Sequence, residues 1–344
     1  MTTKVRMLLL ACTGVIGLML AGSALAAFAP TIAVRHTPPT LNSNGATSLR
    51  VAVPRDHDPL FRAVIYAPTG YTAVLAQPAG TQIGTVEAQV QVREPIAGAV
   101  LPLTGTITAA NPAAYTTNQC APGTHAAVWL LTLQAAGQTL TVPVYVDPTV
   151  GNETAIGAYK LTVCLPSPNI PASAGGATFG AKLILAQLNF SQGVFTTPIN
   201  SGTFRWHMLA TPWPATAAGP PNAAGTVSAQ ARVALPARVT LRATSKRGRV
   251  TITGSVLEAT TGVNRQPIRV RVGNRNYTVR TNAGGAFRLV VRRAVRSRVT
   301  ITVTANIGAR TINCSTPSPF PGVACVNETL QFFLATRSIR VRVR

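Results

Sequence analysis

Residues 267–292 read PIRVRVGNRNYTVRTNAGGAFRLVVR, and they alternate between apolar and polar or basic side chains. Apolar residues occupy every second position from Ile268, with Arg269 between the first two, and the same alternation returns around Tyr277 and again around Phe287. Successive side chains of a β-strand point to opposite faces of a sheet, so this period of two predicts three consecutive strands, each with one buried face. The exposed face is expected to carry five arginines: Arg269, Arg271, Arg280, Arg288 and Arg292.

Two turns are expected to join these strands. Residues directly opposite in an antiparallel pair share a face, so Val272 can pair with Tyr277 across a four-residue loop, which would set Arg269 opposite Arg280. The next turn is expected to be the three-residue loop Asn282-Ala283-Gly284, with glycine in the left-handed position. A loop that begins one residue later would place two arginines directly opposite each other, which is unfavourable. These turns predict one contiguous arginine patch on a single sheet.

Charge is distributed very unevenly along the 344 residues, which have a net charge of +23. A hydrophobic content of 47% with only 11% charged residues excludes a disordered chain. Residues 226–344 hold 21 basic and 2 acidic residues, whereas residues 27–225 hold 8 basic and 6 acidic residues. A GC-rich genome would explain why arginine outnumbers lysine, but it would not concentrate arginine in one part of the chain. The C-terminal third is therefore a distinct cationic unit.

The first 26 residues have the organisation of a signal peptide. Lys4 and Arg6 precede an apolar run over residues 7–20, and small residues lead to Ala26, after which cleavage is expected. The alternative is an uncleaved anchor helix, because the apolar stretch over residues 7–28 is just long enough to span a bilayer. Both interpretations imply export, so the sequence predicts a secreted, extracellular or cell-envelope protein.

Four cysteines follow this leader: Cys120, Cys164, Cys314 and Cys325. An even number in an exported chain indicates disulfides, although four cysteines allow three connectivities. The simplest pairing joins Cys120 to Cys164 and Cys314 to Cys325. A zinc site is not expected, because closely spaced Cys-x-x-Cys pairs are missing.

Short alternating runs between Gly and Pro turns continue through the chain, and no segment shows a helical period with caps. This pattern predicts an all-β protein with two β-sandwich domains. The expected organisation is a signal peptide over residues 1–26, an irregular lead-in over 27–47, a first sandwich over 48–211, a Pro/Ala/Gly-rich linker over 212–235 and an Arg-rich sandwich over 236–344.

The Arg-rich part also contains a recognisable motif series. A Gly-Ser-Val strand begins at Gly254, a Thr-Gly step and a Pro-Ile-x-Val-x-Val run follow, and residues 281–287 read TNAGGAF. This third of the chain resembles bacterial Ig-like and carboxypeptidase-regulatory-like (transthyretin-like) modules. Asn282 stands where such modules usually have Asp, and Arg269 stands at a usually small position. The resemblance implies a non-catalytic spacer or adhesive unit; the first domain resembles no family known to us.

Catalytic and metal-binding motifs are not found in the sequence. Asp56-His57-Asp58 is the one polar cluster that suggests a metal, and a solvated turn before Pro59 explains it better, because hard cations need more oxygen ligands. We therefore expect a non-enzymatic protein that has no metal, cofactor or small-molecule substrate.

The arginine face is the main candidate for function. Same-face residues are spaced about 6.6 Å along a strand and about 4.8 Å between strands, which is less than the Debye length of about 8 Å at physiological salt, so the charges repel. We hypothesise that this face binds an anionic cell-envelope polymer or an anionic membrane surface. The alternative is a purely structural spacer or adhesion module with a solvated face. Base-stacking aromatic residues are lacking there, which argues against nucleic acid.

Overall fold

The structure is a computed structural model that describes residues 28–94, 96–118, 120–135, 137–215, 218–306, 310–312, 328–330 and 334–344. Strands dominate these residues, which confirms the all-β prediction. The helical segments are short 3-10 turns: η2 (Pro112–Tyr115), η3 (Gly151–Ala155), η4 (Ala172–Ala174), η5 (Thr178–Gly180) and η6 (Ala223–Gly225). Within the described ranges, none of the helical segments is long and apolar enough to cross a bilayer. The predicted signal peptide and the predicted Cys314–Cys325 bridge lie outside the described residues.

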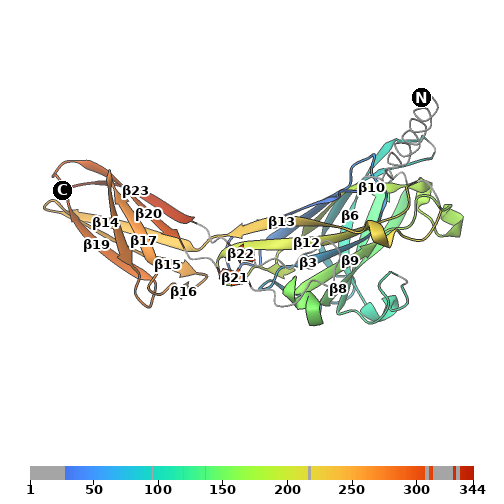
Figure 1. Ribbon diagram of the computed structural model, residues 1–344, viewed down its shortest axis with the longest axis horizontal. Coiled ribbons are helices and arrows are strands. Elements are labelled where there is room, and N and C mark those ends of the chain that lie inside the picture. Colours follow the sequence, from blue (N-terminus) through green and yellow to red (C-terminus); the bar gives the residue numbers. More distant parts are fainter. Residues whose placement is uncertain are drawn as a thin grey trace, which may run out of the picture.

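Figure 1 shows two lobes arranged along the long axis of the molecule. The first, here called the first sandwich, is built from one 11-stranded antiparallel sheet. In spatial order its strands are β1 (Thr31–Thr37), β2 (Ala46–Ala52), β10 (Lys182–Phe190), β5 (Gln82–Gln91), β6 (Val100–Ala110), β7 (Ala127–Ala135), β8 (Gln138–Pro148), β9 (Tyr159–Cys164), β3 (Leu60–Ala67), β12 (Gly202–Pro212) and β13 (Val227–Leu235). A separate pair is formed by β4 (Thr72–Ala73) and β11 (Phe195–Thr196). The large sheet curls until its edge strands β1 and β13 lie beside each other, so both walls of this sandwich belong to one sheet.

Two glycines on neighbouring strands permit this curl. A β-carbon on Gly84 of β5 would lie 2.3 Å from the carbonyl oxygen of Asn189. A β-carbon on Gly105 of β6 would lie 1.9 Å from the carbonyl oxygen of Thr132. Real side chains cannot approach a neighbouring backbone this closely, and glycine is typical of such bends in a sheet. The sharp curvature therefore depends on the missing side chains at these two positions.

Aromatic side chains fill one half of the interior of the first sandwich. Trp129 packs against Phe190 and Phe195 with ring centroids 5.2 and 5.8 Å apart, and Phe195 also contacts Trp206 at 5.8 Å. Both tryptophans are completely buried, as the sequence pattern of their strands requires. Aromatic rings bury large areas and prefer tilted contacts, so this cluster anchors β7, β10 and β12 to one another.

The second lobe, here called the second sandwich, consists of two facing sheets. One sheet contains β14 (Arg238–Lys246), β15 (Arg249–Glu258), β16 (Thr261–Gly262) and β19 (Ala286–Arg292); the other contains β18 (Arg275–Arg280), β17 (Pro267–Val272), β20 (Arg298–Asn306) and β23 (Leu334–Arg342). A further pair is formed by β21 (Arg310–Ile312) and β22 (Glu328–Leu330). Ile252 and Phe287 from the first sheet share one core with Val270 and Ile301 from the second.

The turn between β17 and β18 differs from the predicted four-residue loop. Val272 pairs with Arg275 across the two-residue turn Gly273-Asn274, and Arg269 lies opposite Thr278 rather than Arg280. Two-residue turns are the commonest hairpin connections because their twist matches that of the strands. A register shift of two residues leaves every side chain on the same face. The predicted register is therefore wrong, whereas the predicted faces of these strands are correct.

The predicted hairpin around residues 282–284 is also wrong, because β19 pairs with β15 in the other sheet. The chain crosses between sheets at this point. Thr281, which is buried, donates to the carbonyl of Val263, and the side-chain oxygen of Asn282 accepts hydrogen bonds from the backbone N–H of Gly284 and Ala286 at 3.0 and 2.9 Å. The same turn chemistry can close a hairpin or carry the chain over the core to the facing sheet, and parity does not distinguish the two.

The connection between the sandwiches is much shorter than the predicted linker. Residues 227–235, which were expected in the linker, form β13 and pair along their length with β12. Only Pro236 and Ala237 separate β13 from β14. Beside this joint, the Glu258 carboxylate accepts hydrogen bonds from the backbone N–H of Ser201, at 2.8 Å, and from its hydroxyl. The two sandwiches are thus joined by a nearly continuous strand and a charged hydrogen-bonded contact.

Candidate anion-binding surface

The five predicted arginines lie on two faces that point away from each other. Arg269 and Arg271 on β17 and Arg280 on β18 belong to one sheet, whereas Arg288 and Arg292 on β19 belong to the other. All five side chains are exposed. Because the sheets share one core between them, their outward faces are opposite surfaces of the second sandwich. The structure therefore divides the predicted single patch into a set of three and a set of two.

Arg288 and Arg292 are joined by basic residues that the sequence analysis did not select. Register places Arg242 and Arg288 on either side of Thr253, across β14, β15 and β19. Four residues further along the same three strands lies a second row, in which each residue is directly opposite the next: Lys246, Arg249 and Arg292. Directly opposite β-carbons are about 4.5–5.5 Å apart, and like charges in this arrangement repel. Three cations in one row create a high local density of positive charge.

This row lies at one end of the second sandwich, where three separate stretches of chain meet. The backbone N–H of Gly248 donates to the carbonyl of Arg344 at 2.9 Å, and the backbone N–H of Arg293 donates to the carbonyl of Gly248 at 2.8 Å. The backbone N–H of Arg296 donates to the carbonyl of Val343 at 2.9 Å. Figure 1 places this end, marked by the C-terminus, farthest from the first sandwich. We call it the cationic tip, and it comprises Lys246, Arg247, Arg249, Arg292, Arg293, Arg296, Arg298, Arg342 and Arg344.

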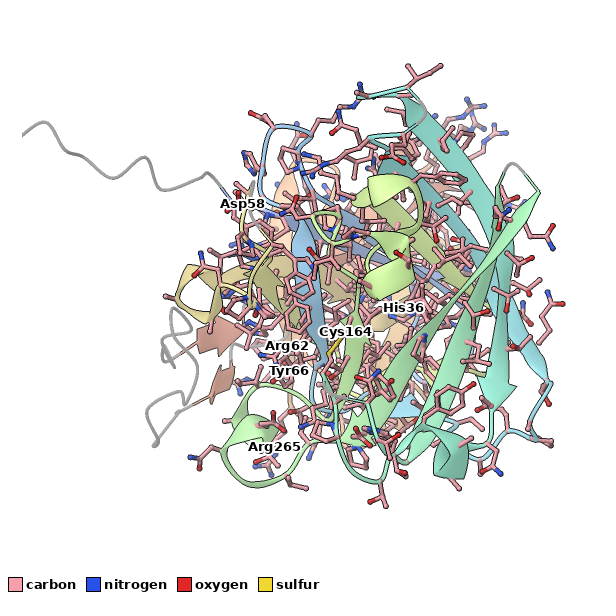
Figure 2. All side chains as sticks on the ribbon, turned by 90° about the vertical axis from the view of Figure 1, so that its right-hand side faces the viewer. His36, Asp58, Arg62, Tyr66, Cys164 and Arg265 are labelled. Carbon is pink, nitrogen blue, oxygen red and sulfur yellow. A yellow bond between two sulfur atoms is a disulfide. The ribbon has the colours of Figure 1, made fainter. Side chains whose placement is uncertain are left out.

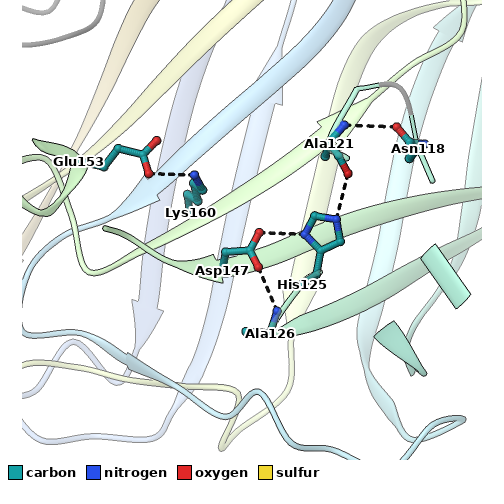
Figure 3. Close-up of polar contacts among 7 residues, drawn as sticks. All are labelled: Asn118, Ala121, His125, Ala126, Asp147, Glu153 and Lys160. Carbon is teal, nitrogen blue, oxygen red and sulfur yellow. Dashed lines mark hydrogen bonds and ion pairs between the residues drawn. The ribbon is translucent and has the colours of Figure 1, made fainter. Parts of the chain in front are cut away.

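Carboxylates do not balance the cationic tip. In the described parts of the second sandwich, no arginine or lysine forms an ion pair with Asp or Glu; the ion pairs seen, Lys160–Glu153 and His125–Asp147, both belong to the first sandwich (Figure 3). Glu258 lies at the opposite end of β15 from Arg249 and accepts hydrogen bonds from Ser201. Arg293 is half-buried and its guanidinium donates to the carbonyl of Val272, whereas the exposed arginines and lysine of the tip can interact with an external anion.

The first sandwich contains a polar cluster around His125, but every ring nitrogen is occupied. Nδ1 lies 2.9 Å from the Asp147 carboxylate and Nε2 lies 3.0 Å from the carbonyl of Ala121, while the other Asp147 oxygen accepts from the backbone N–H of Ala126 (Figure 3). These contacts hold the loop before β7 against β8. The cluster therefore fixes this loop in place, and both His125 nitrogens and both Asp147 oxygens already have hydrogen-bond partners.

The same loop is also fixed by a disulfide. Cys120 and Cys164 are bonded, with Cα atoms 6.3 Å apart, which confirms this half of the predicted pairing (Figure 2). Since Cys164 ends β9, the bridge ties the connection between β6 and β7 to a strand that lies two places from β7 in the sheet. Disulfides persist in oxidising compartments, so this bond fits an exported protein.

Residues 56–58 lie in a turn, as predicted, but Asp58 is buried and not solvated. The His57 ring accepts a hydrogen bond from the backbone N–H of Ala29 at 3.0 Å, and the Lys182 ammonium donates to the carbonyls of Arg55 and His57. Burial raises the pKa of Asp58, and the nearby His57 and Lys182 charges oppose that rise. Among the described residues, no three His, Cys, Asp or Glu side chains gather closely enough to hold a metal ion.

The cationic tip was missed because its residues come from three distant parts of the sequence. The signal that was present is Lys246-Arg247-Gly248-Arg249, a basic turn between two strand patterns. Arg247 and Gly248 both have positive φ values, 49° and 73°, as the two-residue hairpin turn of the mirror-image type requires. Reading this turn as the end of a hairpin would have placed these three basic residues at one tip. Its approach to residues 293–298 and 342–344 follows only from the three-dimensional structure.

Comparison with known proteins gives no family for this chain. No family model matches, and no curated protein matches. Among solved structures, a putative membrane-anchored protein from Corynebacterium diphtheriae is 9% identical with a TM-score of 0.23, covering 92% of this chain and 53% of that chain. A tetra-tandem repeat from the extending region of a large adhesion protein is 10% identical with a TM-score of 0.24, covering 92% of this chain and all of that chain. This chain thus spans about half the length of the Corynebacterium chain. Likeness at this level carries no argument about function, and the predicted Ig-like relationship stays a prediction.

Proposed function

We propose that this chain is a non-enzymatic protein of the cell envelope or the extracellular space that binds an anionic polymer through the cationic tip of its second sandwich. The observation that carries the proposal is the row formed by Lys246, Arg249 and Arg292, which lie directly opposite one another on three strands. The predicted leader and the Cys120–Cys164 bridge support export.

A bound polyanion would relieve the repulsion within the tip. Arginine suits this role because its planar guanidinium can form two parallel hydrogen bonds to one phosphate or carboxylate, which lysine cannot do. A polymer that neutralises several charges also releases its own counterions, so the logarithm of the affinity falls linearly with the logarithm of the salt concentration. The geometry therefore favours a repeating anion over a single small anion.

Two triple variants with the same loss of charge test the proposal. In the first, Lys246, Arg249 and Arg292 are replaced by Gln; in the second, Arg269, Arg271 and Arg280 on the opposite side are replaced by Gln. Affinity for a polyuronate and for polyphosphate is measured over a range of salt concentrations. The tip variant should bind more weakly, and its salt slope should flatten by up to about three units, at roughly one unit per charge. The matched control should retain most of the slope.

Equal effects of the two variants would show that net charge, rather than the tip, determines binding, and would refute the assignment. Binding to anionic vesicles but to neither polymer would replace the polymer by a membrane surface. A structural spacer without a ligand is the second candidate, and the two-residue connection between β13 and β14 favours it. A spacer would show no salt-sensitive binding to any of these probes.

A further inference from the structure

The half of the first sandwich that the aromatic cluster leaves unfilled contains an apolar cavity of about 120 Å³. Aliphatic side chains from both walls line it, among them Leu133, Val142, Leu161 and Leu183. Leu183 retains accessible surface although it faces inward, because it borders empty space instead of a packed neighbour. Lys182 and Thr178 supply the polar side chains of the lining. Apolar cavities of this kind stay dry and bind apolar molecules.

Small side chains at paired positions of neighbouring strands leave this cavity unfilled. Ala88 of β5 and Ala186 of β10 lie directly opposite each other, and both line the empty space together with Ala63 of β3. Four residues further along β10, Phe190 fills the same interior with an aromatic ring. Folded interiors are normally packed as densely as organic crystals, so a void of this size is unusual. The sequence therefore leaves room at one level of the sandwich and fills the next.

A polar hollow of about 330 Å³ adjoins the cavity, and the two share Pro59 and Lys182 in their linings. Its charged residues are Asp56, Asp58, Arg93 and Lys182. Two carboxylates balance two cations, so the hollow has no net charge from these groups. Burial lowers the pKa of Lys182, and the neighbouring Arg93 charge lowers it further, whereas Asp56 and Asp58 act in the opposite direction. An apolar chamber thus meets a polar, electrically balanced entrance.

We propose that the first sandwich binds a single-chain aliphatic amphiphile with an uncharged polar head. The alkyl end occupies the cavity, and the head lies in the polar hollow that Lys182 and residues 56–58 line. An engineered cavity of about 150 Å³ with a similar lining binds benzene, so this cavity accommodates an alkyl segment of about five carbon atoms. The balanced charges at the entrance favour a hydroxyl or sugar head over a carboxylate or an ammonium group. This site is separate from the cationic tip.

The probes are linear 1-alkanols from butanol to decanol, titrated calorimetrically into the full chain. Burial of one methylene group corresponds to about a fourfold gain in affinity. We expect this gain for each added carbon until the cavity is full, at about five or six carbons, and no further gain beyond. Octanoate and octylamine should bind more weakly than octanol. A carboxylate or amine that binds better than the alcohol would refute the assignment of the head group.

Two variants distinguish the cavity from non-specific binding. Ala186→Leu fills the cavity and should abolish saturable binding of the alkanols, while Gln89→Leu adds similar apolar surface to the exposed face of β5 and should leave binding unchanged. If Ala186→Leu fails to fold, Ala88→Val makes a smaller change at the opposed position and should weaken binding at least tenfold. Absence of saturable binding to the unaltered chain, or equal binding by the filled and control variants, would overturn the proposal.

Discussion

The stability of the first sandwich should fall when the pH drops below about 6.5, because of His36. This side chain (Figure 2) is 3% exposed. Its Nδ1 lies 2.8 Å from the Thr47 hydroxyl, and its ring centroid lies 5.1 Å from that of Tyr71. Its other nitrogen has no hydrogen-bond partner among the described residues. Burial lowers the pKa of His36 from 6.5 to about 4, because the charged imidazolium would lose its hydration.

The direction of the effect follows from proton binding. Between pH 6.5 and 4 the unfolded chain binds a proton at His36 that the folded chain excludes, so protons favour unfolding. The stabilisation is complete above pH 6.5 and is lost as the pH falls to about 4, with no further loss from this residue below that value. One pKa unit corresponds to about 1.4 kcal/mol, so this histidine alone should cost about 3 kcal/mol over the range.

The measurement is the free energy of urea unfolding between pH 4 and 8 for the unaltered chain and for His36→Phe. Burial also lowers the pKa of His207, with a further contribution from Arg205, whereas the raised pKa of Asp58 has the opposite effect on stability. Both remain in the variant, so the difference between the two curves isolates His36. That difference should change by about 3 kcal/mol between pH 6.5 and 4. Parallel curves would refute the reasoning.

Three further changes have defined outcomes. Replacing both Cys120 and Cys164 with Ala should lower the free energy of unfolding by about 4 kcal/mol, since the bridge spans 44 residues and constrains the unfolded chain; a loss below about 1 kcal/mol in urea titrations would contradict this. Gly105→Ala should lower stability by about 1–3 kcal/mol, because the new methyl group meets a neighbouring carbonyl, and an unchanged melting temperature would show that the strands separate freely. Glu258→Gln should weaken the contact between the sandwiches by about 1 kcal/mol, since hydrogen bonds to charged acceptors are roughly twice as strong as neutral ones. The measurement is the free energy of unfolding of the second sandwich, followed separately from the first. An unchanged value would mean that the contact does not stabilise the second sandwich.

The alternation of apolar and polar residues predicted which side chains are buried in the second sandwich, but it could not assign strands to sheets. Ile268 and Val270 are buried and Arg269 is exposed, as the alternation required. Parity is unchanged when a register shifts by two residues, so the pairing of Arg269 with Thr278 could not be read from it. A turn around Asn282 can also close a hairpin or cross between sheets, and the choice depends on contacts with distant residues.

Strand β13 and the apolar cavity show two other limits. Residues 227–235 alternate correctly, but the alternation uses alanine at two inward positions, Ala229 and Ala231, which gives a weak hydrophobic signal beside a Pro-rich stretch. The cavity depends on Ala88 meeting Ala186, and nothing local in either strand marks that encounter. The predicted irregular lead-in over residues 27–47 is wrong in the same way, because it contains β1. Predictions from single segments therefore recover faces and most strands, whereas patches and cavities require the pairing of strands.

The joint between the sandwiches has a mechanical consequence. Leu235 is buried in the core of the first sandwich and Ala237 in the core of the second, so the backbone leaves one packed body and enters the next within two residues. A tensile load applied at the far end of the second sandwich would pass along β14 into β13. There it would act along the strand, so the hydrogen bonds to β12 would have to shear together instead of breaking one at a time. The load would therefore pass directly from the site at the far end into the main sheet of the first sandwich.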